Sequence, residues 1–217
     1  MIQPTRTAVA AVRILFREYG YWQSVRRRAP VDAAGNPVPW LTYPAVEYLD
    51  QFDFSAKTVF EFGAGQSTRF WCARAARVVS VESNPVWYER VRGQMAANGA
   101  IYLVPEPGRY AQRLAQETDR FDVIVVDGIE RRACCTEAVQ KLRPGGLIIL
   151  DNADWHHHCA ALLRAAGLLE VDMTGFGPCN GYTWTTSLFF HREFAFPLRG
   201  NRQPLHGRGS LPHLESA

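Results

Sequence analysis

The sequence predicts an α/β fold: one sheet of seven mostly parallel strands with an antiparallel last strand, helices on both faces and an N-terminal helical extension. From residue 58 onward, short apolar runs rich in β-branched residues alternate with helical patterns, which is typical of parallel strands joined by crossover helices. The last two runs are joined by a Gly- and Pro-rich link that is too short for a helix. The chain has 217 residues, 47% of them hydrophobic, which suits one domain with a buried core.

The expected elements follow from two periodicities. Strands are predicted where short runs of Val, Ile, Leu and Phe lie between turn formers, at 58–62, 78–81, 101–104, 123–126, 147–150, 168–173 and 186–190. Helices are predicted where apolar residues recur every three or four positions, at 67–76, 85–98, 110–118, 132–142 and 154–166. Before them, an amphipathic helix over 5–19 ends at Gly20, and a further helix covers 44–52. The stretch 20–44 between these helices is rich in proline and is expected to be irregular.

Composition divides the chain into three segments. Residues 1–54 hold the N-terminal helix and a cap segment rich in proline and aromatic residues, which is either a lid over a pocket or a strap over one sheet face. Residues 55–192 form the core domain. Residues 193–217 end in a stretch of Arg, Gly, Pro, His and Ser and are expected to be a flexible tail.

Charge, cysteine content and apolar stretches give expectations about binding partners and cellular setting. The chain has 24 basic and 21 acidic side chains, a small excess that does not indicate nucleic-acid binding. Its five cysteines form no CxxC pair, and no secretory signal precedes them, which favours a reducing, cytoplasmic setting. Arg13 interrupts the apolar stretch after Ala8, so no membrane span is expected. The oligomeric state stays open.

A glycine turn follows the first strand of the core domain. Gly63-Ala64-Gly65 leads directly into a helix that Ser67 or Thr68 would cap. Glycines there let the backbone approach a ligand closely. Glu82 ends the next strand, 17 residues past Gly65, where a carboxylate can accept both hydroxyls of an adenosine ribose.

Two ligands fit this pattern, a dinucleotide and S-adenosylmethionine, and three details favour the second. Glu61, two residues before the turn, would repel a pyrophosphate but suits a cationic ligand. Position 68 is Thr, so the third glycine of GxGxxG is missing. The antiparallel last strand is also unlike that of dehydrogenases.

With these residues in place, the chain resembles the class I S-adenosylmethionine-dependent methyltransferases over residues 55–192, a Rossmann-like fold. The matching stretches are 61–65, 81–83, 122–128 and the LRPGG turn at 142–146. The resemblance implies that the glycine turn holds the methionine part of the cofactor and Glu82 the ribose. The implied cofactor-binding set is Glu61, Gly63, Ala64, Gly65, Ser67, Thr68, Glu82, Ser83, Asp127 and Gly128.

Further polar residues follow strands four and five, at the sheet edge where such folds bind ligands. Asp127, Asp151 and Asn152 resemble the divalent-metal site of catechol O-methyltransferases, although position 130 is Glu where those enzymes have lysine. The other interpretation is that Asp127 bonds the cofactor or backbone and the pair at 151–152 caps a helix. His156 is the expected base, since its unperturbed pKa suits proton removal near neutral pH. The expected catalytic set is Asp127, Asp151 and His156.

The predicted function is methyl transfer from S-adenosylmethionine to a hydroxyl of a small-molecule or sugar acceptor. Aromatic residues in the link 175–187 would form one wall of the acceptor pocket, with Trp22, Trp40 and Tyr43 opposite, or would simply pack against the cap segment. Two alternatives stay open: a non-catalytic S-adenosylmethionine-binding partner subunit, and a nucleotide-dependent oxidoreductase. Polyamine aminopropyl transfer is disfavoured because no GGGDG loop is present.

Overall fold

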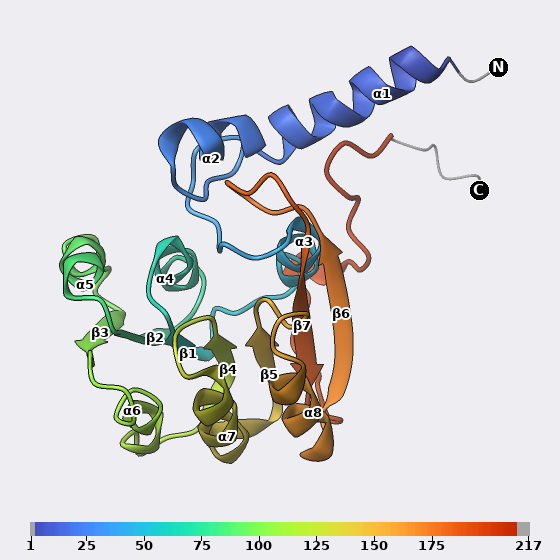
Figure 1. Ribbon diagram of the computed structural model, residues 1–217. Helices are drawn as coiled ribbons and strands as arrows, with labels where there is room; N and C mark the ends of the chain where they lie inside the picture. Colours follow the sequence, from blue (N-terminus) through green and yellow to red (C-terminus); the bar gives the residue numbers. More distant parts are fainter. Residues whose placement is uncertain (1–2, 212–217) are drawn as a thin grey trace.

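The structure is a computed structural model that describes residues 3–211, and it has three layers with the sheet in the middle (Figure 1). The strands lie in the order β3-β2-β1-β4-β5-β7-β6. Their bounds are β1 Thr58–Phe62, β2 Arg77–Glu82, β3 Gly99–Leu103, β4 Phe121–Val126, β5 Leu142–Leu150, β6 Leu169–Gly175 and β7 Trp184–Phe190. All seven predicted strands are present.

Strand direction confirms the predicted sheet. β1 pairs in parallel with both β2 and β4, and β5 continues the parallel set beside β4. β7 inserts between β5 and β6 and is antiparallel to both. The strand order therefore reverses at β1: β2 and β3 lie on one side of it, and β4 and the later strands lie on the other. Open α/β sheets bind ligands at such a switch point, here between the ends of β1 and β4.

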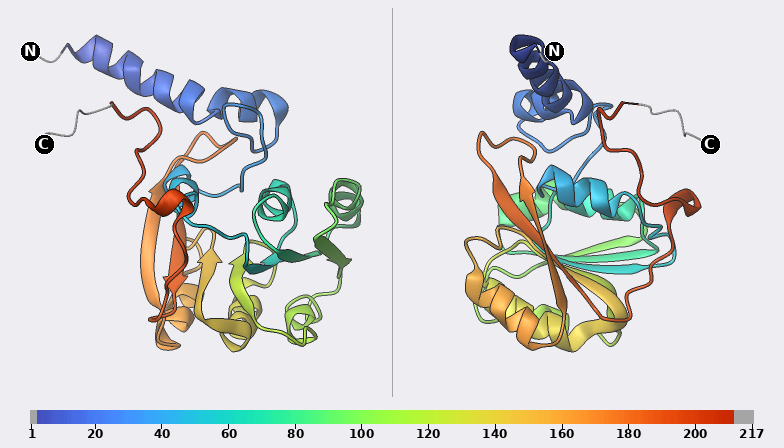
Figure 2. Two further views of the ribbon diagram at one scale, coloured as in Figure 1. Left: turned by 180° about the vertical axis from the view of Figure 1, so that it is seen from behind. Right: turned by 90° about the vertical axis from the view of Figure 1, so that its right-hand side faces the viewer.

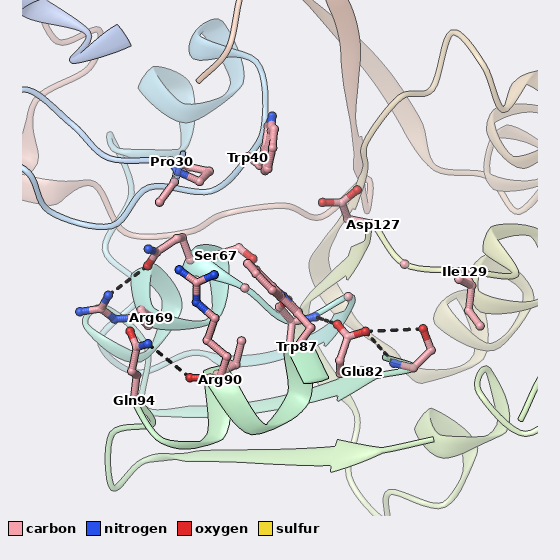
Figure 3. A pocket seen from close by; sticks show the side chains of 18 of the residues that line it. Pro30, Trp40, Ser67, Arg69, Glu82, Trp87, Arg90, Gln94, Asp127 and Ile129 are labelled. Carbon is pink, nitrogen blue, oxygen red and sulfur yellow. Dashed lines mark hydrogen bonds between the residues drawn. The ribbon is translucent and has the colours of Figure 1, made fainter. Parts of the chain in front are cut away.

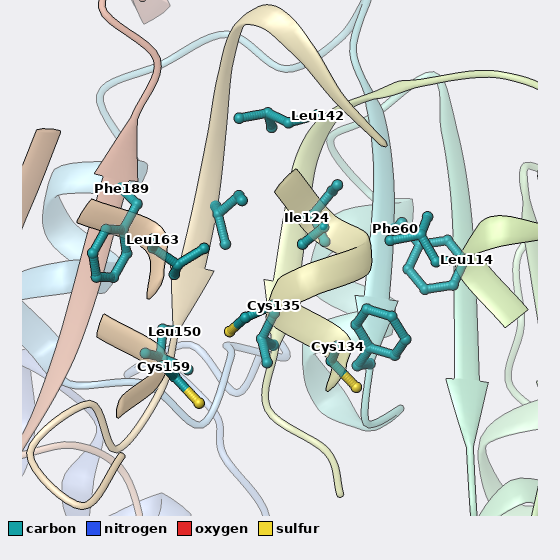
Figure 4. Packing of buried hydrophobic residues seen from close by; sticks show 14 of the residues in the cluster. Phe60, Leu114, Ile124, Cys134, Cys135, Leu142, Leu150, Cys159, Leu163 and Phe189 are labelled. Carbon is teal, nitrogen blue, oxygen red and sulfur yellow. The ribbon is translucent and has the colours of Figure 1, made fainter. Parts of the chain in front are cut away.

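Helices cover both faces of the sheet, as the two views of Figure 2 show. One face carries α3 Tyr43–Leu49, α4 Gln66–Cys72 and α5 Pro85–Arg92, and the other carries α6 Gln112–Ala115, α7 Arg131–Lys141 and α8 His157–Ala165. Each face buries its own apolar cluster. Figure 4 shows the second face, where Cys134, Cys135 and Cys159 pack as fully buried apolar residues.

Several of these helices are shorter than predicted: α4 ends at Cys72 rather than at residue 76, and α6 covers four residues of the predicted 110–118. In α5 and α8, side-chain contacts account for the difference. α5 ends at Arg92 rather than at residue 98, because the Asn98 amide donates to the carbonyls of Cys72 and Ala75 and holds the chain in a turn. α8 begins at His157 rather than at residue 154, because the Asp154 carboxylate accepts from the Thr185 backbone instead of lying in a first helical turn.

The N-terminal segment contains one more helix than expected. α1 Pro4–Arg13 continues into a π-helical turn at Ile14–Glu18, and then α2 Tyr21–Arg27 lies within the stretch predicted to be irregular. The prediction for 20–44 was wrong at this point because Gly20 in the left-handed region (φ 73°) allows a sharp bend, after which the helix can restart. α1 extends away from the body of the molecule (Figure 1).

Segments from both ends of the chain pack against the core domain. Phe194 and Phe196 contact Phe52, which is buried in the same cluster as β1 residues. The Arg208 backbone N–H donates to the Glu47 carboxylate on α3. Residues 212–217 of the predicted tail lie outside the described residues, and the three-part division of the chain stays a prediction.

No helix among residues 3–211 is both long enough and apolar enough to cross a lipid bilayer.

Candidate functional site

The glycine turn after β1 lies against the loop after β4. Gly63 has φ 92°, and a Cβ built on it would lie 2.8 Å from the Asp127 carbonyl oxygen. Gly65 differs: its φ is −176°, and a Cβ there would meet nothing closer than the Ser67 hydroxyl and Trp87, both at 3.8 Å. Gly63 therefore permits the close packing of two loops, whereas Gly65 leaves space beside the turn.

Glu82 ties the end of β2 to this turn. Its carboxylate is 8% exposed and accepts from the Ala64 backbone N–H at 3.1 Å. The other oxygen accepts from the backbone N–H groups of Ser83 and Asn84, each at 2.8 Å. The acid is thus fixed in orientation at the sheet edge, and Oε2, which accepts one hydrogen bond, is open to a further hydroxyl donor.

Glu61 lies directly beneath the turn and is fully buried. One carboxylate oxygen accepts from the hydroxyls of Thr68 and Ser80, and the Thr68 oxygen in turn accepts from the Gly65 N–H at 2.9 Å. Among residues 3–211, the other oxygen, Oε1, has no hydrogen-bond partner. Burial raises the pKa of Glu61 to about 7, against the opposing effect of the hydroxyl donors.

A pocket of about 450 Å³ opens above these residues (Figure 3). Eight of the ten predicted cofactor-binding residues line it: Gly63, Ala64, Gly65, Ser67, Glu82, Ser83, Asp127 and Gly128. Glu61 and Thr68 do not reach its surface and support the turn from below. The volume is within the range of small-molecule sites.

The pocket has further walls that the sequence analysis missed. They include Arg28 and Pro30 from the N-terminal segment, Trp87 and Arg90 from α5, and Tyr110 and Ile129, and they lie beside Trp40, which was predicted to face an acceptor. Figure 3 shows Trp40 and Pro30 on the opposite side of the pocket from Trp87 and Glu82. Most of these residues lie far from the glycine motif in the chain, and no local pattern in the sequence joins them to it.

Trp87 on α5 contacts the glycine turn. Its indole N–H donates to the Ala64 carbonyl, and its side chain remains about a third exposed, at 37%. The Arg90 guanidinium lies 5.0 Å from the ring centroid. Trp87 is therefore held in place while presenting an aromatic surface to the pocket, which suits stacking with a planar ring.

An arginine links the ends of β4 and β5. The Arg131 guanidinium pairs with the Asp127 carboxylate at 2.9 Å and also donates to the carbonyls of Gly128 and Asp151. Burial and the nearby Asp151 carboxylate raise the pKa of Asp127, and Arg131 opposes this shift. The sequence analysis gave Arg131 no role.

Asp151 is buried beneath the site and does not line the pocket. Its Oδ1 accepts from the Trp184 indole at 2.9 Å and from the Thr186 hydroxyl at 2.6 Å, both on β7. Burial raises the pKa of Asp151 to about 6, against these donors. The carboxylate thus holds β7 to the end of β5.

These contacts do not fit a divalent-metal site. Asp127 is paired with a guanidinium that occupies the space between the two strand ends, and Asp151 is turned toward β7. Within residues 3–211, no three His, Cys, Asp or Glu side chains converge as ligands would. A hard cation needs several free oxygen ligands in one place, and this edge of the sheet does not offer them.

His156 lies in a second cavity, an open cleft of about 930 Å³ between the start of α7 and the loop after β5. Gly128 and Ile129 line both this cleft and the first pocket, so the two adjoin. Burial, together with the charge of Arg131, lowers the pKa of His156. Its imidazole is therefore mainly neutral at pH 7, the form that can accept a proton.

The N-terminal segment and the β6–β7 link pack on each other. The Tyr43 backbone donates to the Phe176 carbonyl at 2.7 Å, and the Tyr21 hydroxyl donates to the Asn180 carbonyl. Trp22 instead stacks on Phe16, away from the pocket. Of the three cap aromatics predicted to face an acceptor, only Trp40 lines the first pocket.

Comparison with known proteins gives matches in fold alone. No family model matches the chain, and no curated protein matches its sequence. A candidate O-methyltransferase from Klebsiella pneumoniae aligns with a TM-score of 0.55 and 16% identity over 84% of this chain and 89% of that one. Precorrin-6y C5,15-methyltransferase from Geobacter metallireducens aligns with a TM-score of 0.52 and 15% identity, over 68% of this chain and 87% of that one. Spermidine synthase from Thermotoga maritima aligns with a TM-score of 0.52 and 15% identity, over 70% of this chain and 57% of that one.

At these identities the likeness concerns architecture, and it agrees with the observed sheet. The parallel strands, the reversed β7 and the switch point between β1 and β4 are all present in this chain. The protein therefore has the fold of the class I S-adenosylmethionine-dependent methyltransferases.

Proposed function

We propose that this protein transfers a methyl group from S-adenosylmethionine to an oxygen of a small-molecule or sugar acceptor. The observation that carries the proposal is the pocket at the β1–β4 switch point, where the glycine turn and the fixed carboxylate of Glu82 line one cavity. Methyltransferases of the same fold support the reaction. The free state of all five cysteines is consistent with the cytoplasmic setting that forms part of the proposal.

The residues of the pocket fit this cofactor. Glu82 would accept the ribose hydroxyls, and the space beside Gly65 would take the methionine part. The buried carboxyl of Glu61, whose Oε1 has no partner among residues 3–211, lies under a ligand that carries a sulfonium and an ammonium group, and these cations would favour its ionised form. Trp87 would pack against the adenine. When bound, S-adenosylmethionine supplies an electrophilic methyl group.

The adjoining cleft would hold the acceptor. Methyl transfer is an in-line displacement, so the protein must mainly align the acceptor oxygen and remove its proton. His156 is the proposed base, since its neutral imidazole lines the cleft. Asp127 and Asp151 are proposed to position the site, through Arg131 and β7 respectively, and no metal ion takes part in the proposed mechanism.

Calorimetric titration with S-adenosylhomocysteine tests the proposal, with a reduced dinucleotide as the competing ligand. We expect binding of the nucleoside alone, and Glu82→Gln should weaken it by about tenfold or more, because a charge-assisted hydrogen bond contributes about 1.5–3 kcal/mol. Glu89→Gln, at an exposed position on α5, is the matched control and should bind as the parent does.

Each contrary outcome has a distinct meaning. Binding of the dinucleotide would favour the oxidoreductase alternative. Equal affinity of the parent and Glu82→Gln would remove the ribose assignment. Binding of the nucleoside without methyl transfer to any sugar or phenol in an acceptor screen would favour the non-catalytic partner subunit.

A further inference from the structure

The second cavity, which we call the cationic cleft, is lined by more basic than acidic side chains. Arg131, Arg132, His156 and His158 line it, and Glu130 is the one acidic residue among its lining residues. The cleft is open to solvent and adjoins the first pocket at Gly128 and Ile129. A molecule in the cleft can therefore reach the space where the cofactor is proposed to bind.

The positive charge in this cleft is only partly neutralised. Asp127 pairs with Arg131. Arg132 is exposed and, among residues 3–211, forms no ion pair. The Glu130 carboxylate accepts from the Gly108 backbone N–H at 2.8 Å, which commits one of its oxygens to the loop after β3. Arg132 thus presents to the cleft a charge that is not engaged in an ion pair, with the Glu130 carboxylate as the opposing charge nearby.

The two helices at the cleft add to this field. α7 begins at Arg131 and α8 at His157, and neither has a capping side chain bonded to its first turn. Their first backbone N–H groups therefore carry partial positive charge that no side chain satisfies. Because Arg132 stands at the start of α7, the side-chain charge and these N–H groups favour the same kind of ligand.

The remaining wall of the cleft is aromatic. Trp155 is 60% exposed, which is unusual for so large an apolar side chain, and its ring centroid lies 6.4 Å from that of Tyr182. An exposed indole beside basic side chains suits a ligand with both an apolar ring and an anionic group.

We infer that the cationic cleft recognises methyl acceptors that carry an anionic group, a carboxylate or a phosphate, through Arg132 and Arg131, with the apolar part of the acceptor on Trp155. This inference rests on the proposed function, because the cleft is an acceptor site only if the first pocket holds the methyl donor. It narrows the acceptors from sugars and phenols in general to their acidic derivatives.

The test uses the full chain saturated with S-adenosylhomocysteine and four calorimetric probes. These are 4-hydroxybenzoate, 4-hydroxyphenyl phosphate, inorganic phosphate and the neutral analogue 4-hydroxybenzamide. We expect the two anionic phenols to bind at least about tenfold more tightly than the amide, which corresponds to about 1.4 kcal/mol. The stronger of the two identifies carboxylate or phosphate as the preferred group. Binding of inorganic phosphate with none of the phenols would overturn the inference, because the cleft would then take a free ion rather than an acceptor.

Three variants are expected to lower, raise and leave unchanged the affinity for the anionic probes. Arg132→Gln should reduce the affinity for the anionic probes by about tenfold, since it removes the free charge. Glu130→Gln removes the opposing charge while keeping an acceptor for Gly108, and should raise that affinity. Arg164→Gln, at the far end of α8 and paired with Glu170, removes the same charge outside the cleft and should leave binding unchanged.

The outcomes separate this inference from the proposed function. Equal binding of the anionic and neutral phenols, no binding of any anionic probe, or an Arg132→Gln variant that binds like the parent would each overturn the inference while nucleoside binding persists. Failure of S-adenosylhomocysteine itself to bind would overturn the proposed function instead. Thermal unfolding of each variant shows whether a loss of binding reflects a loss of folding.

Discussion

At the residue scale, two glycines of one turn serve different physical purposes. Gly63 has a left-handed φ and no room for a Cβ against the loop of Asp127, so the glycine stabilises the fold. Gly65 has an extended φ that any residue can adopt, and the space beside it belongs to the pocket. A side chain at position 65 would therefore compete with a ligand rather than with the fold.

This contrast gives a prediction for two substitutions. Gly63→Ala should lower the free energy of unfolding by about 1–3 kcal/mol because of strain and the clash with the Asp127 carbonyl. Gly65→Val should keep near-parental stability and lose nucleoside binding. Urea unfolding and calorimetric titration measure the two effects. Parental binding by Gly65→Val would contradict the placement of the ligand beside the turn.

His156 gives a second prediction at this scale. Its lowered pKa means that the free imidazole persists below pH 6.5 and becomes protonated only in more acidic solution. An NMR titration of the histidine rings should show this midpoint. With an acceptor from the screen, kcat/KM should fall on the acid side with the same midpoint, and His156→Gln should lose about 100-fold or more in rate. His157→Gln, outside both cavities, is the control, and an unchanged rate in His156→Gln would exclude it as the base.

At the scale of elements, the ends of β4, β5 and β7 are held together by polar contacts. Arg131, at the first turn of α7, bonds three groups from the two loops that follow β4 and β5. Asp151 then bonds two side chains of β7. The walls of the acceptor site therefore depend on buried and partly buried polar contacts whose partners come from different elements, and such contacts cost most when one partner is removed.

Replacement of Arg131 by methionine tests this arrangement. Arg131→Met should lower the free energy of unfolding by about 1–3 kcal/mol, because Asp127 loses its partner and the carbonyl oxygens lose their donor. Arg132→Met, one position along and exposed, should change stability by less than about 0.5 kcal/mol. Urea unfolding curves at neutral pH compare the two variants. Similar stability for both would show that the contacts of Arg131 contribute little.

At the scale of the whole molecule, the carboxyl group of Glu61 is buried in the centre of the sheet. Glu61 is fully buried on β1, and its pKa is raised to about 7 from a model-peptide value near 4.5. A carboxyl that is harder to ionise in the folded state favours folding while it is protonated. Its contribution is therefore fully present below about pH 4.5 and is lost as the pH rises through 7.

The pH dependence of stability follows from this sign. Glu61→Gln keeps the hydrogen-bonding shape without the charge, so the variant should become more stable relative to the parent as the pH rises from 4.5 to 7. The full difference is roughly 3 kcal/mol for a shift of this size. Thermal unfolding of both proteins at several pH values measures it. A constant difference across this range would show that the pKa of Glu61 is close to its ordinary value.

The sequence determined the order and type of the core elements and the position of the glycine turn, because these depend on local patterns. Alternating apolar runs, Gly63, Gly65 and the acid at Glu82 can be read from neighbours in the chain. Only the tertiary structure decided what surrounds them. Trp40 reaches the pocket through the fold of the N-terminal segment, and Arg131 lies between the strand ends where the resemblance to catechol O-methyltransferases implied a metal ion. Such contacts join residues far apart in the chain, and periodicity carries no information about them.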